Sequence, residues 1–388
     1  MQDKQKEILD LTIEMMKFPS ISVGEEISIE GIRQCYSFIT NYLKKNGLRV
    51  VEFDEGGKTP ALYCDCSKSS STNGNILLTG HFDKVSPASP SQLLPSIEGD
   101  WLKGRGSADM LTVVATYMVF MKDLKKKAGD LPGIGLLLVG NEEPGEYEKW
   151  GTPHILDSLK QQFNYKPSIM IVGERTGEGA EKTSKIENKN RGIIRIHLES
   201  FSKAAHTALV QEKTAMDIIF ELKDHITNLI PSHRDSIWKT SFMLSYLLTG
   251  QTFNFNINPQ SAKAGFEIRP IPEDDISSVV ESLTEKANEL GVKIKILNNE
   301  KGVSTPPSHP LLKILLDAAA TVNGGNPSNY LGNGKLPGSQ ARFAPPRCAS
   351  VVFGQSGVGP HTNHEAHYIP SILPYYKILW EILNKRMH

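Results

Sequence analysis

Cysteine is scarce in this sequence, and so are long apolar runs and any excess of one charge. The 388 residues include only four cysteines, Cys35, Cys64, Cys66 and Cys348, too few for a disulfide framework in a chain of this length. Cys64 and Cys66 lie two positions apart and would form only half of a thiolate metal site, so we interpret them as strand residues. A reducing, cytoplasmic location is therefore expected.

Charge and hydropathy exclude two further classes of protein. Lys+Arg and Asp+Glu both number 43, and there is no concentrated basic patch, so nucleic acid is not an expected partner. The longest apolar stretches are far shorter than the roughly 20 residues of a membrane span, so no membrane partner is expected either. The first residues, MQDKQKEILDLTIEMMKF, are charged and lack the apolar core of a signal peptide, which indicates an amphipathic helix.

What the sequence does contain is an alternation of short apolar runs and amphipathic segments. Uninterrupted runs typical of buried strands occur in NILLTGH, GIGLLLVG and PSIMIVG, and a helix is predicted from Asp109 onward. This alternation continues to about residue 184. It indicates an α/β class protein with a doubly wound, mixed sheet.

The pattern changes near residue 188. Several strands, one of them expected in QTFNFNI, cluster with two helices up to about residue 298. They indicate an inserted α+β domain whose sheet is covered on one face. Helix and strand alternate again after a proline-rich connector. We therefore expect one domain formed by 1–187 and 299–388 and an insert at 188–298.

Acidic and imidazole side chains follow several of the predicted strands. They are His81 and Asp83 in GHFD, Asp109 in GRGSADM, Glu142 and Glu143 in VGNEEPG, Glu174 in IVGERTG and His361 in GVGPHTNHEAH. Each alone has an ordinary explanation as a loop histidine, a helix cap or a solvated carboxylate. Together they converge, because the carboxyl ends of strands in an open α/β sheet meet in one crevice.

A crevice with so many carboxylates requires cations, since the like charges would otherwise repel one another. Imidazole and carboxylate ligands without thiolate suit zinc in a hydrolytic role. Two metal ions about 3.5–4 Å apart could share one bridging carboxylate.

The order of these motifs resembles a known family. GH-x-D, GRG-x-x-DM, N-EE-x-G, GE-x-T and a late P-H-T follow one another between about residues 75 and 370. They resemble the zinc-dependent aminoacylase, deacetylase and carboxypeptidase G family, which includes acetylornithine deacetylases and succinyl-diaminopimelate desuccinylases. The resemblance implies a zinc exopeptidase-like catalytic domain, an inserted lid and dimerisation domain, and a homodimer.

The resemblance also implies two zinc ions per subunit, with Co²⁺ or Mn²⁺ as possible substitutes. His81 and Glu174 would complete one metal site, and Glu143 and His361 the other. Asp109 would bridge the two ions.

Three further residues would act beside the metal ions. Asp83 would grip the free ring nitrogen of His81 and so orient that ligand. Glu142 would be the general base on the metal-held water and return the proton to the leaving amine. His206 in KAAHTAL would stabilise the oxyanion, often in the partner's site; taken alone, it is a turn or helix-start histidine.

Four residues would bind the substrate. Asn256 and Arg269 would hold its carboxylate, although a sheet-edge salt bridge is the alternative for Arg269. Gly338 and Ser339 would cradle a carboxylate through their backbone groups.

Four positions depart from the family pattern without replacing a ligand. Lys84 stands where valine is usual, Leu111 where lysine is common, Arg175 where proline is usual, and Gln340 where deacylases have aspartate. The last change alters the predicted substrate pocket.

The expected function is the metal-dependent hydrolysis of an N-acyl amino acid that carries an acetyl- or succinyl-type group. EIRPIP resembles the acetylornithine deacetylases, to which the prediction inclines, and SQARF the desuccinylases. A dipeptidase or carboxypeptidase of the same family is the alternative. A non-catalytic binder is disfavoured because Glu142 and all ligands are present, and a dinucleotide enzyme because GRGSADM lacks the G-x-G-x-x-G fingerprint.

Overall fold

The computed structural model describes residues 2–24, 26–54, 59–66, 73–128, 133–145, 151–210, 212–230 and 236–387. The chain divides into two compact units. The main unit contains Met1–Lys189, Ser304–Lys335 and Ser339–His388, and the inserted unit contains Asn190–Val303 and Leu336–Gly338. The short return segment Leu336–Gly338 was not among the predictions.

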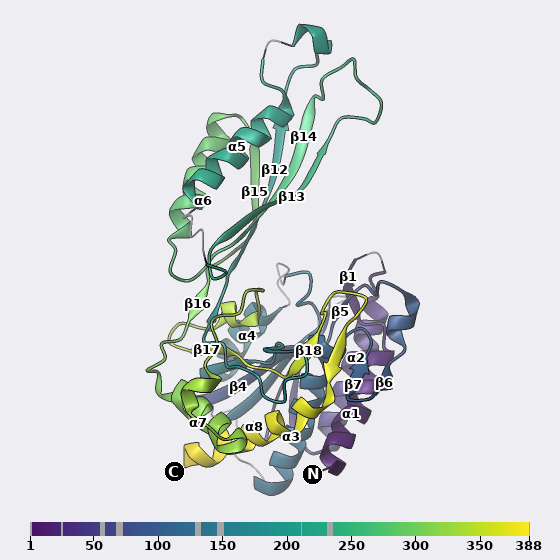
Figure 1. Ribbon diagram of the computed structural model, residues 1–388, viewed down its shortest axis with the longest axis vertical. Coiled ribbons are helices and arrows are strands. Elements are labelled where there is room, and N and C mark those ends of the chain that lie inside the picture. Colours follow the sequence, from purple (N-terminus) through teal and green to yellow (C-terminus); the bar gives the residue numbers. More distant parts are fainter. Residues whose placement is uncertain are drawn as a thin grey trace. The chain divides into compact units, whose positions relative to one another are not determined.

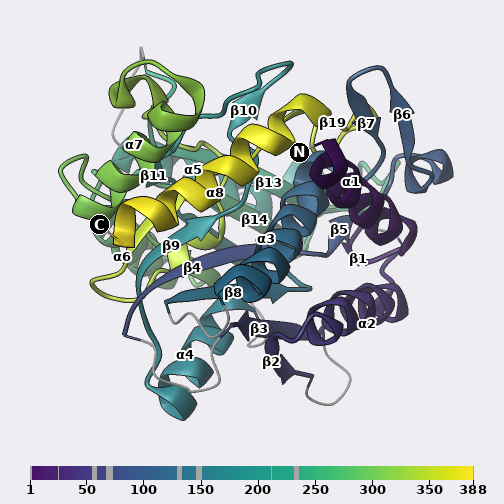
Figure 2. The same cartoon turned by 90° about the horizontal axis from the view of Figure 1, so that it is seen from below.

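A six-stranded sheet lies at the centre of the main unit, in the order β17, β9, β4, β8, β3, β2 (Figures 1 and 2). Strands β17 (Ala349–Val352), β9 (Lys166–Val172), β4 (Asn73–His81) and β8 (Ile134–Val139) run parallel. Strands β3 (Ala61–Asp65) and β2 (Arg49–Phe53) are each antiparallel to their preceding neighbour. Every residue of β8 is buried, as expected for a strand covered on both faces. The predicted α/β class with a mixed sheet is confirmed.

Helices surround this sheet. They are α1 (Gln2–Lys17), α2 (Ile29–Lys45), α3 (Thr112–Ala128), α4 (Thr152–Phe163), α7 (Pro310–Asn323) and α8 (Ile372–Met387). All but α4 contribute to one buried cluster with the strands, and α3 contacts β4 and β8. Lysines in the last turn of α3 suit the negative end of the helix dipole. None of the helices among the described residues combines the length and apolar character that crossing a bilayer requires.

The helix predicted from Asp109 begins later than expected. Regular helix α3 starts at Thr112, whereas Asp109 lies in the distorted turn η2 (Ser107–Leu111) with φ −133° and ψ 94°. The backbone N–H groups of Ala108 and Asp109 donate to Oε1 of Glu365 at 3.0 and 3.1 Å. A buried carboxylate therefore holds this segment outside the helix, and the prediction of a helical Asp109 was wrong.

Smaller sheets of the main unit support the loops at the edge of the central sheet. A five-stranded sheet has the order β10 (Gly177–Glu178), β18 (Ser356–Val358), β19 (Ala366–Tyr368), β7 (Trp101–Lys103), β6 (Ser96–Glu98). Strand β1 (Ile21–Val23) pairs with β5 (Lys84–Val85). Strands β11 (Lys189–Asn190) and β16 (Val303–Ser304) pair where the chain enters and leaves the inserted unit. The β18–β19 connection carries His361, and the β1–β5 pair brings Ser22 to Asp83.

The inserted unit contains a four-stranded antiparallel sheet, in the order β13 (Ser241–Thr249), β14 (Ser261–Arg269), β12 (Ile193–Phe201), β15 (Lys293–Glu300). Helices α5 (Ala215–Leu229) and α6 (Ile276–Glu289) lie on the same face of this sheet (Figure 1). They share a second buried cluster with the strands. The expected α+β insert with a sheet covered on one face is confirmed.

The strand predicted in QTFNFNI is not present. Strand β13 ends at Thr249, and residues 250–256 form a loop in which Gly250 and Phe253 have φ angles of 67° and 64°. Gly250 precedes the predicted strand and Phe253 lies within it, and the left-handed backbone of Phe253 interrupts the extended conformation. The alternating Phe and Asn side chains therefore imitate a strand pattern without forming a strand.

Candidate metal centre

Three parallel strands bring ligand-type side chains to one edge of the main sheet. His81 is the last residue of β4, which lies between β9 and β8. Glu174 follows the end of β9 by two residues, and Glu142 and Glu143 follow the end of β8. Because parallel strands have their carboxyl ends at the same edge, these side chains share one crevice.

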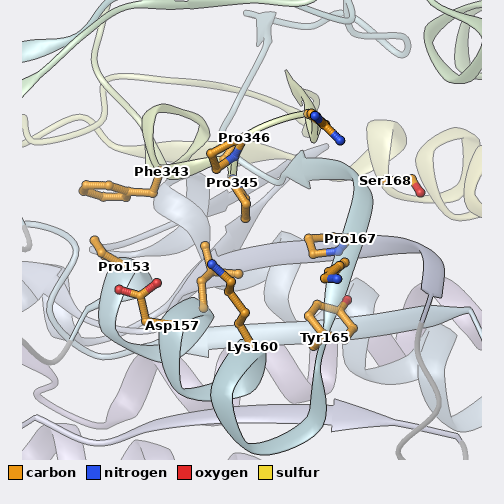
Figure 3. A pocket seen from close by; sticks show the side chains of 13 residues that line it. Pro153, Asp157, Lys160, Tyr165, Pro167, Ser168, Phe343, Pro345 and Pro346 are labelled. Carbon is orange, nitrogen blue, oxygen red and sulfur yellow. The ribbon is translucent and has the colours of Figure 1, made fainter.

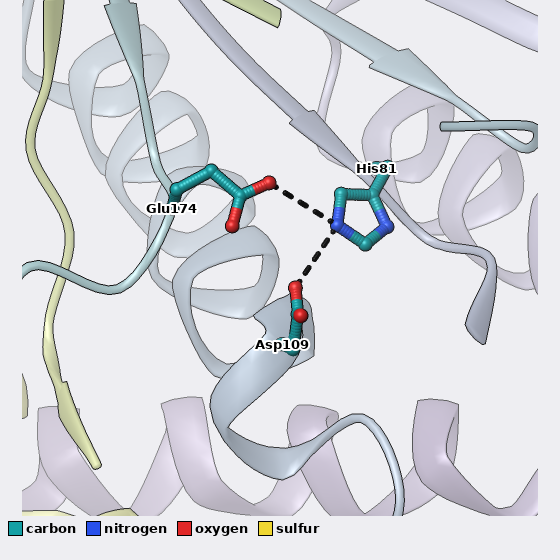
Figure 4. Close-up of side chains that lie close together, drawn as sticks. All are labelled: His81, Asp109 and Glu174. Carbon is teal, nitrogen blue, oxygen red and sulfur yellow. Dashed lines mark hydrogen bonds and ion pairs between the residues drawn. The ribbon is translucent and has the colours of Figure 1, made fainter. Parts of the chain in front are cut away.

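The first cluster consists of His81, Asp109 and Glu174 (Figure 4). Nε2 of His81 lies 3.1 Å from Oδ1 of Asp109 and 3.5 Å from Oε1 of Glu174. The imidazole is buried, and each residue offers one ligand atom within 4.8 Å of the others.

The second cluster consists of Asp109, Glu143 and His361. Nε2 of His361 lies 3.1 Å from Oδ2 of Asp109 and 3.1 Å from Oε2 of Glu143. The two oxygens of Asp109 therefore face one imidazole each. His361 adopts a left-handed conformation, with φ 63°, in the loop that follows β18.

Both clusters fit a divalent metal ion in spacing and in donor type. Ligand atoms about 2.0–2.2 Å from a tetrahedral Zn²⁺ lie roughly 3.3 Å from one another. The contacts of 3.1–3.5 Å in the two clusters match that separation. Imidazole and carboxylate donors also suit several first-row divalent ions, so the donor set supports a two-metal site and leaves the element open.

The pKa values of these residues show which charge the two clusters favour. Burial alone would lower the pKa of His81, but its bonds with Asp109 and other carboxylates outweigh burial and hold that pKa well above its usual value. Hydrogen bonds with Asp109 and Glu143 raise the pKa of His361 to about 11. Burial and the adjacent Asp109 raise the pKa of Glu143 to about 8. Positive charge is thus favoured at both clusters, which is the charge that dications supply.

Asp83 organises the surroundings of His81. Its backbone oxygen lies 3.1 Å and its Oδ1 3.4 Å from Nδ1 of His81, the ring nitrogen that faces away from the cluster. The carboxylate also accepts the N–H groups of Glu142 and Glu143, both at 3.1 Å, and the hydroxyl of Ser22 at 2.5 Å. Asp83 therefore links the end of β4 to the segment that carries both glutamates.

Glu142 lies next to the clusters without belonging to either. Burial raises the pKa of Glu142, and the positive charges of His81 and Arg342 act in the opposite direction. Its Oε1 lies 3.5 Å from Nη1 of Arg342. A carboxylate in this position is suited to exchanging a proton with a molecule bound at the metal centre.

Two residues of the site were missed from the sequence. Glu365 is buried, accepts the N–H groups of Ala108 and Asp109, and pairs with Arg105 at 2.5 Å. Arg342 contacts Glu142. Glu365 occurs in GVGPHTNHEAH, four residues after His361, and Arg342 occurs in SQARF, three residues after Ser339. Neither spacing indicates a role in the site.

Several other predicted site residues lie in the inserted unit. His206 caps the short turn η3 (Thr207–Leu209) through Nδ1, which accepts the N–H of Ala208 at 3.2 Å. The backbone oxygen of Asn256 accepts the N–H of Thr207 at 3.0 Å, so the predicted oxyanion and carboxylate ligands come from adjoining loops.

The remaining predicted substrate ligands surround the return segment of the chain. Arg269 ends β14 and donates from Nε to Glu267 at 2.8 Å, so the salt bridge considered as its alternative role exists. A Cβ atom at Gly338 would lie 2.6 Å from Cδ1 of Ile193 and 2.9 Å from Nη1 of Arg269, so a larger residue there would displace these side chains. Ser339 belongs to the main unit, is buried and caps η5 (Gln340–Phe343).

Known proteins resemble this chain in sequence and in fold. Residues 77–385 match Peptidase family M20/M25/M40. The chain is 24% identical over 387 residues to a succinyl-diaminopimelate desuccinylase of a Nitratiruptor species, covering 97% of this chain and 99% of that protein.

Solved structures share the fold. The M20 family metallo-carboxypeptidase Sso-CP2 from Sulfolobus solfataricus has a TM-score of 0.74 at 19% identity, covering 97% of this chain and 98% of that one. The Bacillus subtilis YXEP protein, a dinuclear metal-binding M20 peptidase, has a TM-score of 0.66 at 10% identity, covering 98% and 97%. The family match covers most of the chain and contains every residue of both clusters, so this chain belongs to peptidase family M20/M25/M40 and is a metallohydrolase.

Proposed function

We propose that this protein hydrolyses the amide bond of an N-acyl amino acid, releasing an acetyl- or succinyl-type acid and a free amine. The observation that carries the proposal is the carboxylate of Asp109, whose two oxygens each lie 3.1 Å from one imidazole. One side chain shared by two ligand clusters is the arrangement required for a pair of metal ions that act on one bond.

The chain's residues divide between holding the ions and moving protons. His81 and Glu174 would hold one ion, Glu143 and His361 the other, and Asp109 both. When bound, such a pair of dications polarises an amide carbonyl and makes a water molecule more acidic. Zinc is the ion that we propose.

Glu142 would act as the general base and then as the general acid. Its carboxylate takes one proton from the attacking water as the C–O bond forms, and it gives that proton to the amine nitrogen as the C–N bond breaks. The carboxylate of Asp83 accepts the backbone N–H of Glu142. This hydrogen bond fixes the backbone from which the proton-transferring side chain of Glu142 extends.

The inserted unit would supply the groups that recognise the substrate. We propose that His206 stabilises the oxyanion, and that Asn256 and Arg269 bind the carboxylate of the amino acid. Gly338 and Ser339 would offer backbone groups to a carboxylate. These roles follow from the family resemblance.

The identity of the acyl group is the most specific part of the proposal. The relative from Nitratiruptor is named a desuccinylase, which supports a succinyl group, whereas the EIRPIP segment resembles acetylornithine deacetylases. Gln340 occupies the position of the deacylase aspartate, and its Nε2 donates to Thr152 at 2.7 Å. A peptidase of the same family is the competing outcome.

The proposal is tested with metal-loaded protein and three substrate classes: N-acetylornithine, N-succinyl-diaminopimelate and a panel of dipeptides. We expect turnover of one N-acyl amino acid, and turnover confined to dipeptides would contradict the deacylase assignment. Glu142→Ala should keep two ions per chain and lose about 10²–10⁴-fold in kcat. A variant with unchanged kcat would remove Glu142 from the role of base.

A further inference from the structure

The guanidinium of Arg342 is buried next to Glu142. Its side chain is 0% exposed, and Nη1 lies 3.5 Å from Oε1 of Glu142. Nη2 donates to the backbone oxygen of Gly145 at 3.3 Å. Within the part of the chain that the structure describes, Nε and Nη1 have no hydrogen-bond partner.

A buried arginine with so few partners needs an explanation. Arginine stays protonated in proteins, and a buried charge is costly unless an opposite charge compensates it. Among the residues that the structure describes, the carboxylate of Glu142 is an anionic group that faces this guanidinium. Arg342 and Glu142 therefore depend on each other electrostatically.

The neighbours of Arg342 restrict its movement. Cζ of the guanidinium lies 4.2 Å from the centroid of the Phe343 ring, within the range of a cation–π contact. The same short turn, η5, is tied to α4 by the hydrogen bond from Gln340 to Thr152. The charge of Arg342 is thus held in one place before any substrate binds.

The Phe343 ring also offers a way to loosen this support. It lines a cavity of about 830 Å³ together with residues of α4, of the start of β9 and of the segment after η5 (Figure 3). Because the ring borders a cavity, Phe343→Leu enlarges that cavity and does not open a void inside the packed core. The substitution removes the ring and keeps the charge of Arg342.

We propose that Arg342 is a positioning residue, which holds the carboxylate of Glu142 in the orientation that receives the proton of the attacking water. This inference rests on the proposed role of Glu142 as the base. A glutamate side chain has three rotatable bonds, and a carboxylate beside two dications is attracted to them as a ligand. The fixed charge of Arg342 restrains those bonds, and a displacement of about 1 Å costs up to roughly 10²-fold in rate.

The test is a double-substitution cycle. Arg342→Met should lower kcat by about 10- to 100-fold with KM nearly unchanged, because the orientation of the base affects only the reacting state. Arg342→Lys and Phe343→Leu should each lower kcat by less than Arg342→Met does. In protein that already carries Glu142→Ala, Arg342→Met should change kcat by less than about 2-fold, since no base remains to be positioned.

The control is Arg49→Met, which removes an arginine paired with Asp65 on strands β2 and β3. It should lower the melting temperature and leave kcat unchanged. If Arg342→Met lowers kcat by the same factor in the wild type and in Glu142→Ala, the role of Arg342 is merely structural. A loss of metal content in Arg342→Met would show the same. Either result overturns the proposal.

A readout without substrate separates this inference from the proposed function. The shifts in melting temperature caused by Glu142→Ala and Arg342→Met should not add if the two side chains interact. Additive shifts would overturn the inference even in an active enzyme. Non-additive shifts in a protein that hydrolyses no N-acyl amino acid would support the contact while refuting the substrate class. If Arg342→Met does not fold, Arg342→Lys takes its place in both cycles.

Discussion

At the scale of single residues, Asp109 is the side chain on which both clusters depend. Its oxygens lie 3.1 Å from Nε2 of His81 and 3.1 Å from Nε2 of His361. Asp109→Asn removes the charge and one of the two oxygen donors. We expect metal content after dialysis to fall from two ions per chain to one or none, with kcat lower by at least about 10²-fold.

The matched control is Asp123→Asn on helix α3, where the carboxylate binds Lys4 and Tyr376. It makes the same chemical change away from the clusters and should leave two ions per chain. Elemental analysis of both proteins gives the answer. Two retained ions in Asp109→Asn would show that the carboxylate does not bridge.

Asp83 is expected to act on the metal through other residues. Its carboxylate faces Nδ1 of His81 at 3.4 Å and accepts both glutamate N–H groups that follow β8. Asp83→Ala should weaken metal binding by about 10- to 100-fold, since the ligands lose their orientation. Ser22→Ala, which removes one donor to the same carboxylate, should weaken it less. A chelator competition measures both, and wild-type affinity in Asp83→Ala would contradict this role.

At the scale of the elements, Lys84 connects strand β5 to the end of helix α1. Its ammonium is buried and donates to the backbone oxygens of Met16 at 3.0 Å and Phe18 at 2.6 Å. Burial lowers the pKa of Lys84 from 10.5 to about 8. Between these two values the unfolded chain binds more protons here than the folded chain does, so the contribution of Lys84 to stability increases with pH.

This linkage gives a prediction with a definite sign. Between pH 7.5 and pH 10.5, the unfolding free energy of the wild type should rise by about 3 kcal/mol relative to Lys84→Met. Denaturant titrations of both proteins at the two pH values measure the difference. Groups distant from Lys84 titrate alike in both proteins, so a constant difference would show that burial does not destabilise the ammonium.

The elements also show what the sequence could and could not predict. Short apolar runs in the sequence mark β4, β8 and β9. Parallel strands have their carboxyl ends at one edge of the sheet, so the grouping of His81, Glu143 and Glu174 could be predicted from the sequence. The conformation of Asp109 could not be predicted, because it depends on a hydrogen bond with Glu365, which is 256 positions away in the sequence. The contact of Arg342 with Glu142 likewise joins segments that are 200 positions apart in the sequence.

At the scale of the whole molecule, an exposed edge strand of the inserted unit is the basis on which we predict a homodimer. Strand β13 is an edge strand of its sheet, and Met243 and Leu248 on it are 58% and 63% exposed. We predict that light scattering gives about twice the chain mass of 42.9 kDa. Met243→Lys with Leu248→Lys should give the monomer mass, because charge on an edge strand opposes pairing. A monomeric wild type would contradict the prediction.

If the protein is a dimer, the subunit that receives His206 can be identified by mixing two inactive variants. The predicted oxyanion role makes His206→Ala inactive, and Glu142→Ala is inactive for want of a base. In a mixed dimer, the site that keeps Glu142 regains activity only if His206 comes from the other chain. Random mixing makes half of the dimers mixed, each with one of two sites repaired, so about a quarter of the wild-type rate should return. If dimers shown to be mixed have no activity, then His206 serves its own chain.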